Sequence, residues 1–69
     1  MTGKIIKLDK TGWGFITSVD KPFTRIFFHW TGLSQKAPNF TELKKGMQVS
    51  FDIIEYQDKG WRAIKIEVS

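Results

Sequence analysis

Apolar and polar residues alternate with a period of two along most of this chain, which is the pattern of β-strands. The alternation predicts strands over residues 4–8, 13–18, 25–30, 47–56 and 61–68. Turns rich in Gly, Pro, Asn or Asp are expected at 9–12, 19–24, 41–46 and 58–60, with a short helical turn at 31–34 and an irregular loop at 35–40. Five short strands without a long helix indicate one all-β domain over residues 1–69, built as a small barrel or a sandwich.

The last two predicted strands show which side chains should form the core. Val49, Phe51 and Ile53 alternate with polar residues in the fourth strand, and we expect them to face inward. In the fifth strand we expect Ile64 and Ile66 to face inward as well. A closed barrel would also pair the strand edges that an open sheet leaves exposed.

The second and third predicted strands carry more aromatic rings than a small domain can bury. If Ile16, Ile26 and Phe28 face the core, the alternation places a group of rings together on the outer face: Trp13, Phe15, Phe27 and His29. The opposite phase would expose those three core candidates instead, which is worse for burial. Contiguous exposed apolar patches mark interaction sites. Flat rings on a sheet surface are the means by which proteins stack unpaired nucleic-acid bases.

The composition narrows the function classes. A net charge of +4 and a pI near 9.6 favour acidic partners, nucleic acid foremost. The chain has no Cys and a single His, so it offers no disulfide and no set of zinc ligands, and we expect no metal or other cofactor. No apolar run approaches the roughly 20 residues that span a membrane, and no signal peptide is visible at the start. We therefore expect a soluble cytoplasmic protein without a membrane partner.

Basic residues that border the rings are the candidate phosphate contacts, namely Lys7, Lys10, Arg25 and Arg62. Two further tryptophans are open to two interpretations. Trp30 either extends the ring surface or packs on the following turn, and Trp61 either caps the barrel end or joins the ring surface. His29 stands without a nucleophile-and-base or metal-ligand arrangement, so we expect it to contact a base and expect no enzyme activity.

Several motifs together resemble those of the cold-shock domain family, almost from end to end. The first ribonucleoprotein motif of that family is similar to Thr11–Gly12–Trp13–Gly14–Phe15–Ile16, and the second to Ile26–Phe27–Phe28–His29–Trp30. Downstream similarity covers Phe40, Leu43, Gly46–Met47–Gln48–Val49 and Phe51, then Lys59–Gly60–Trp61–Arg62–Ala63. The resemblance implies a five-stranded antiparallel OB-fold barrel that binds single-stranded RNA and DNA. It also implies that Phe40 is part of the binding surface, whereas the residues alone leave open a Phe40 ring that folds back onto the barrel. The resemblance further implies RNA chaperone work that influences gene expression.

The chain departs from the family pattern at the first strand. Lys7 and Leu8 stand where the family carries a tryptophan and a phenylalanine, so one base-stacking ring is missing. Trp13 and Trp30 replace phenylalanines and offer larger rings, which indicates a re-tuned binding surface. The alternative is a protein-interaction module that has drifted from nucleic-acid binding. We expect a monomer, with a strand-swapped dimer as the other possibility.

Overall fold

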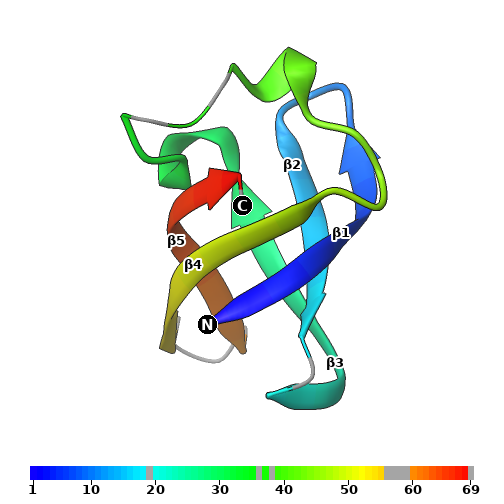
Figure 1. The fold of residues 1–69 in the computed structure, drawn as a ribbon, viewed down its shortest axis with the longest axis vertical. Helices are drawn as coiled ribbons and strands as arrows, with labels where there is room; N and C mark the ends of the chain where they lie inside the picture. The colour runs from blue at the N-terminus through cyan, green and yellow to red at the C-terminus, as the bar shows by residue number, and fades with distance from the viewer. Residues whose placement is uncertain (19, 36, 38, 56–59, 69) are drawn as a thin grey trace.

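The computed structural model describes residues 1–18, 20–35, 37, 39–55 and 60–68, without the side chains of 21–24. Its strands are β1 (Thr2–Asp9), β2 (Trp13–Ser18), β3 (Lys21–His29), β4 (Gln48–Glu55) and β5 (Trp61–Val68) (Figure 1). Two 3₁₀ helices lie between β3 and β4: η1 (Trp30–Gly32) and η2 (Phe40–Glu42). The turn residues predicted at 19 and 58–59 lie outside the described residues.

The strands close into a barrel in the order β1-β2-β3-β5-β4, which confirms the predicted fold class. Four neighbouring pairs are antiparallel, whereas β3 and β5 pair in parallel at Phe27 and Arg62. A ring of five strands cannot alternate direction all the way round, because five is odd. The purely antiparallel barrel of the prediction therefore needs one parallel seam, and the structure places it between β3 and β5.

The predicted phase of β2 and β3 is confirmed. Ile16, Ile26 and Phe28 are fully buried, and Gly14 is buried opposite Phe28, its partner across the two strands. A Cβ atom at position 14 would lie only 2.2 Å from the Lys7 carbonyl oxygen and 2.8 Å from the Phe28 ring. The barrel interior therefore accepts no side chain at this position, and the two neighbours of Gly14 on β2, Trp13 and Phe15, face outward.

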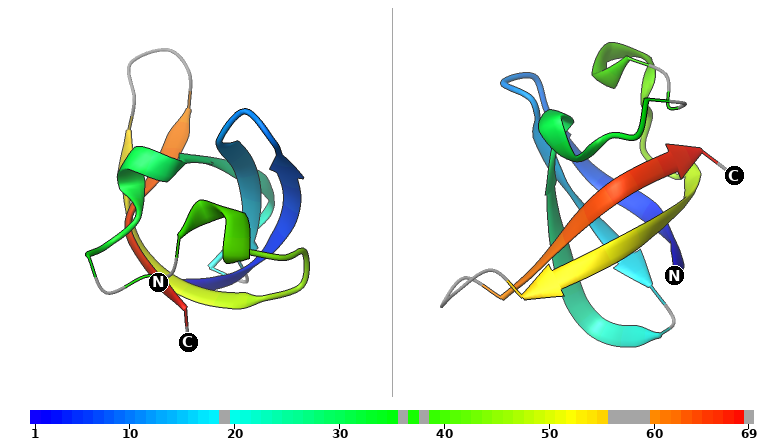
Figure 2. Two further views of the ribbon diagram at one scale, coloured as in Figure 1. Left: turned by 90° about the horizontal axis from the view of Figure 1, so that it is seen from above. Right: turned by 90° about the vertical axis from the view of Figure 1, so that its left-hand side faces the viewer.

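The core is closed at one end by η2, which lies across the mouth of the barrel when it is viewed from above (Figure 2). Phe40 packs against the buried cluster there, with its ring centroid 6.0 Å from that of Phe28. Val49 and Phe51 of β4 are buried as predicted, and Ile53 packs against the same cluster.

The predicted turn at 19–24 is too long, because β3 already begins at Lys21. The hairpin closes tightly, with Ser18 paired to Lys21. The Ser18 hydroxyl donates to the Thr2 carbonyl at 2.6 Å and accepts the backbone N–H of Asp20 at 3.2 Å. A side chain that satisfies the turn in this way lets the ladder continue where composition indicated a loop.

The predicted inward position of Ile64 is also wrong. Ala63 and Ile66 are buried in β5, and Ile64 is only half-buried. The β4–β5 register shifts between Ser50 and Asp52, and Lys65 adopts a φ of 53° in the left-handed region. This irregularity adds a residue to β5 and resets the side-chain alternation, so the period of two fails across it.

The turn between β1 and β2 is held by the Asp9 carboxylate. It accepts the Thr11 hydroxyl at 2.6 Å and the Thr11 backbone N–H at 2.9 Å, while Gly12 N–H donates to the Asp9 carbonyl at 3.0 Å. The bonds from the Thr11 hydroxyl and backbone, and more weakly the charge of Lys7, lower the pKa of Asp9 below its ordinary 3.8. The turn thereby fixes the point at which β2, and with it Trp13, begins.

Replacement of Gly14 tests the packing of the barrel interior. Gly14→Ala should lower the free energy of unfolding by about 3 kcal/mol, at the upper end of overpacking effects, because the new methyl group meets backbone as well as the Phe28 ring. Urea unfolding measures the loss. Thr17→Ala, at an exposed position on the same strand, is the control and should change stability by less than about 0.5 kcal/mol. Equal stability of the two variants would contradict the packing described.

The Asp9 turn gives a pH prediction. Because folding lowers this pKa, the stabilisation exists above the ordinary value of 3.8 and is lost as the pH falls through the lower folded-state pKa. Thr11→Ala should move the NMR titration midpoint of the Asp9 carboxyl group upward, toward 3.8. An unchanged midpoint would show that the Thr11 hydroxyl does not hold the carboxylate.

Candidate nucleic-acid interface

Three rings on the outer face of β2 and β3 contact one another, and we call Trp13, Phe15 and Phe27 the aromatic platform. Phe15 and Phe27 are direct cross-strand partners, with ring centroids 6.1 Å apart in an edge-on arrangement. Trp13 lies 5.6 Å from Phe15, also edge-on, and 6.2 Å from Phe27 with the planes inclined by 27°. Each ring remains partly exposed. The structure thus brings together the rings that the sequence placed on one face.

Each platform ring has a basic side chain above it. Lys7 Nζ lies 5.1 Å from the centroid of the Trp13 ring, and the guanidinium carbons of Arg25 and Arg62 lie 5.7 Å from Phe15 and 5.6 Å from Phe27. These distances are within the range of cation–π attraction. The aromatic faces are therefore bordered by positive charge, which is the combination that holds bases and phosphates of unpaired strands.

His29 and Trp30 extend the rings toward the end of β3. Their centroids are 5.6 Å apart, and His29 is the cross-strand partner of Trp13. Trp30 is 54% exposed and opens η1, and its indole lies over Gly12, where an added Cβ would meet it at 2.6 Å. Its backbone N–H donates to the Gly12 carbonyl at 2.8 Å. Trp30 thus packs on the preceding β1–β2 turn, where the sequence had offered the following one, and it remains open to solvent. Its part in the ring surface stays a prediction.

The sequence did not identify Thr31, which contacts both His29 and Arg62. Its backbone N–H donates to His29 Nδ1 at 3.3 Å, and its hydroxyl lies 3.0 Å from the same nitrogen. Arg62 Nη2 donates to that hydroxyl at 3.4 Å. Since Nδ1 is an acceptor, the neutral ring carries its proton on Nε2, which can donate to a base. A threonine two residues after the histidine, at the start of a helical turn, is the local signal that could have identified it.

The other predicted site residues, Lys10, Phe40 and Trp61, take no part in the ring and cation contacts described above. Phe40 packs on the barrel end, with its ring against that of Phe28. Lys10 is exposed in the β1–β2 turn, beside Phe40 at a hollow of about 340 Å³. Trp61 is half-buried and packs against the core cluster at the start of β5. The part these three residues play in binding stays a prediction.

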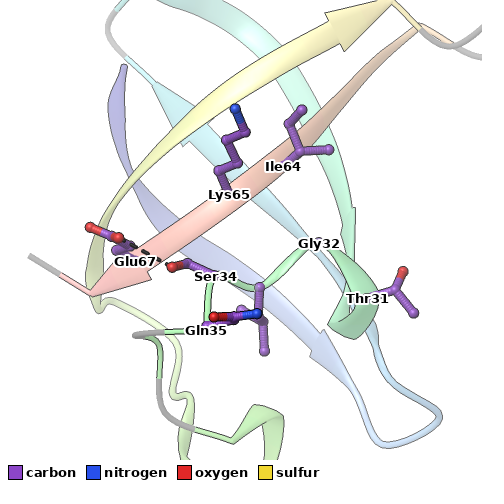
Figure 3. Close-up of a pocket in the computed structure, with 8 residues that line it drawn as sticks. Thr31, Gly32, Ser34, Gln35, Ile64, Lys65 and Glu67 are labelled. Atoms are coloured by element: carbon purple, nitrogen blue, oxygen red, sulfur yellow. Dashed lines mark hydrogen bonds between the residues drawn. The ribbon is translucent and has the colours of Figure 1, made fainter.

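A second hollow, of about 510 Å³, lies between the segment that follows η1 and β5 (Figure 3). Thr31 is at one edge of it, and the Ser34 hydroxyl donates across it to Glu67 at 3.2 Å. Ser34 N–H also donates to the Ile66 carbonyl at 2.9 Å, and Leu33 bridges to Ile66. These contacts attach the segment to β5 next to the parallel seam, so they hold the barrel closed beside the site.

The described residues contain no group of three or more His, Cys, Asp or Glu side chains placed to hold a metal ion. None of the helices in the described ranges is long and apolar enough to cross a membrane. The chemistry gathered at the described site is that of rings, cations and hydrogen-bond donors.

Comparisons with known proteins agree with this geometry. The sequence matches the family model described as the "'Cold-shock' DNA-binding domain" over residues 1–69. Among the solved structures, a chain titled "drosophila Unr CSD456" is similar, with a TM-score of 0.77 and 29% sequence identity. The match covers 99% of this chain and 26% of that one, so this chain spans about a quarter of its neighbour's length. A search of curated protein sequences finds no match. With its whole length matched and a barrel of the expected topology, the chain belongs to the cold-shock family of nucleic-acid-binding domains.

Proposed function

We propose that this protein binds single-stranded RNA and DNA by stacking unpaired bases on the aromatic platform. The observation that carries the proposal is the contact of three partly exposed rings, each with a cation 5.1–5.7 Å from its centroid. Aromatic rings on the outside of a barrel contribute less to folding stability than rings in the core. Their exposed faces are, however, available for stacking with nucleic-acid bases. Membership of a DNA-binding family supports the same activity.

On binding, a nucleic-acid base would replace the basic side chain that lies over each ring. In the protein alone, Lys7, Arg25 and Arg62 lie over the rings. A base that stacks on a ring displaces the cation toward the adjacent phosphate, where the attraction between opposite charges is regained. Each stacked base contributes about 1–3 kcal/mol. Paired bases in a duplex are already stacked on their neighbours and do not offer their faces, so selectivity for single strands follows.

The same binding would give an RNA chaperone activity without catalysis. A protein that binds only the open strand shifts a hairpin toward its unpaired form by mass action. No energy source is needed for this, and stacking tolerates every base. We propose that the chain acts in this way as a regulator of gene expression. We further propose that it does so as a monomer in the cytoplasm.

Removal of single platform rings tests the proposal. Phe15→Ala and Phe27→Ala should each weaken binding to oligothymidine and oligouridine between about fivefold and a hundredfold, the equivalent of one lost stack. Fluorescence anisotropy of a labelled oligonucleotide measures the affinity, and thermal unfolding establishes that each variant is folded. Thr17→Ala, on the outer face of β2, is the control and should bind as the original protein does. Absence of single-strand binding by the original protein would instead favour the protein-interaction module.

Salt dependence tests the part of the cations. Arg25 is exposed and lies over Phe15, so Arg25→Gln removes a charge without opening the core. If Arg25 moves to a phosphate on binding, the slope of log affinity against log salt concentration should become shallower by about 0.7. Lys45→Gln, which removes a charge from an exposed turn, should leave the slope less affected. Identical slopes for Arg25→Gln and the original protein would contradict a phosphate contact at this position.

A further inference from the structure

Cross-strand partners form a row of residues around the barrel. The row that contains Phe15 and Phe27 continues beyond β3. Lys7 on β1 is the partner of Phe15 on β2, which pairs with Phe27 on β3. Phe27 pairs across the parallel seam with Arg62 on β5, and Arg62 pairs with Ile54 on β4. One continuous row of outward positions therefore crosses all the strands of the barrel. Among the described pairs, the row through Trp13 and His29 crosses β1, β2 and β3 and is not continued on β5.

Ile54 is an unusual residue at the end of such a row. Its side chain is 40% exposed, whereas its neighbour Ile53 packs against the core cluster. Arg62 lies between Ile54 and the platform and extends its guanidinium over Phe27. The surface that begins with stacked rings thus continues through a cation to an exposed aliphatic side chain.

We infer that Ile54 and Arg62 extend the binding surface across the seam, so that a single strand stacked on Phe27 continues over β5 and places a further base against Ile54. This inference rests on the proposed function. Two strand spacings separate Phe27 from Ile54, roughly 10 Å, a distance that the nucleotides following a stacked base can span. The aliphatic side chain takes an apolar base face, while Arg62 takes a phosphate.

The charges around Ile54 indicate where the surface ends. Asp52 and Glu55 are exposed on the same strand, and both repel phosphates. A nucleic-acid strand that reaches Ile54 therefore contacts this side chain with a base, and its phosphates do not continue along β4. The single-stranded ligand would lie across the barrel, from the Lys7 side to Ile54, and the length of bound oligonucleotide would be limited by this end.

A length series with a matched pair of variants tests the inference. Ile54→Ser removes the exposed aliphatic group at the end of the row. Val68→Ser removes a similarly exposed one, 36% against 40%, at the far end of β5. Affinities for labelled oligothymidines of about four and about eight nucleotides are measured by anisotropy, within the range that one OB-fold covers. Thermal unfolding establishes that both variants are folded.

Ile54→Ser should weaken binding of the longer oligonucleotide about fivefold and leave the shorter one unchanged, while Val68→Ser should bind both as the original protein does. Equal affinity of Ile54→Ser and the original protein for the longer strand, or an equal loss at both lengths, would overturn the inference. In either case the proposed function stands, because the original protein binds. If the original protein binds neither strand, the proposed function fails, and an exposed Ile54 is then left to contacts with another protein.

Discussion

The Lys7 carbonyl oxygen and the ring of Phe28 leave no space for a side chain at position 14, and the arrangement of the outer surface depends on this close packing. Phe28 fills the barrel interior opposite Gly14, where an added Cβ would lie 2.8 Å from the ring. Because successive side chains of a strand point to opposite faces, a glycine forced inward at 14 forces residues 13 and 15 outward. The exposed rings Trp13 and Phe15 are thus a consequence of how the core is packed.

Polar contacts in the segments next to β2 and β3 border the outward rings. Asp9 fixes the turn before Trp13, and Thr31 connects His29 on β3 to Arg62 on β5. The second connection spans the parallel seam, which an odd number of strands makes unavoidable. A site built on paired strands is more rigid than one built on loops, so the rings are positioned before any ligand arrives. Under the proposed function the cations above the rings would change partners, which long basic side chains can do without a change in the backbone.

Alternation predicted the core of β2 and β3 because their two faces differ sharply in kind, with Ile16, Ile26 and Phe28 on one side. In β5 the alternation wrongly placed Ile64 inward. Lys65 adopts a left-handed backbone conformation there, and no glycine or proline in the sequence of this strand indicates it. The neighbours of a residue across strands depend on register and barrel closure, which one strand's sequence does not contain. For that reason Arg62 could be named as a phosphate contact from its place beside Trp61, whereas its position over Phe27 and the continuation to Ile54 needed the structure.

An NMR spectrum of the protein bound to a short oligothymidine tests whether unpaired bases lie on the rings of Trp13, Phe15 and Phe27. Nuclear Overhauser contacts between thymine protons and ring protons report proximity without any substitution. We expect such contacts to all three rings, together with upfield shifts of the thymine signals caused by the ring currents. A saturated complex in which the thymine protons show contacts only to other parts of the barrel would show that bases do not stack on the platform.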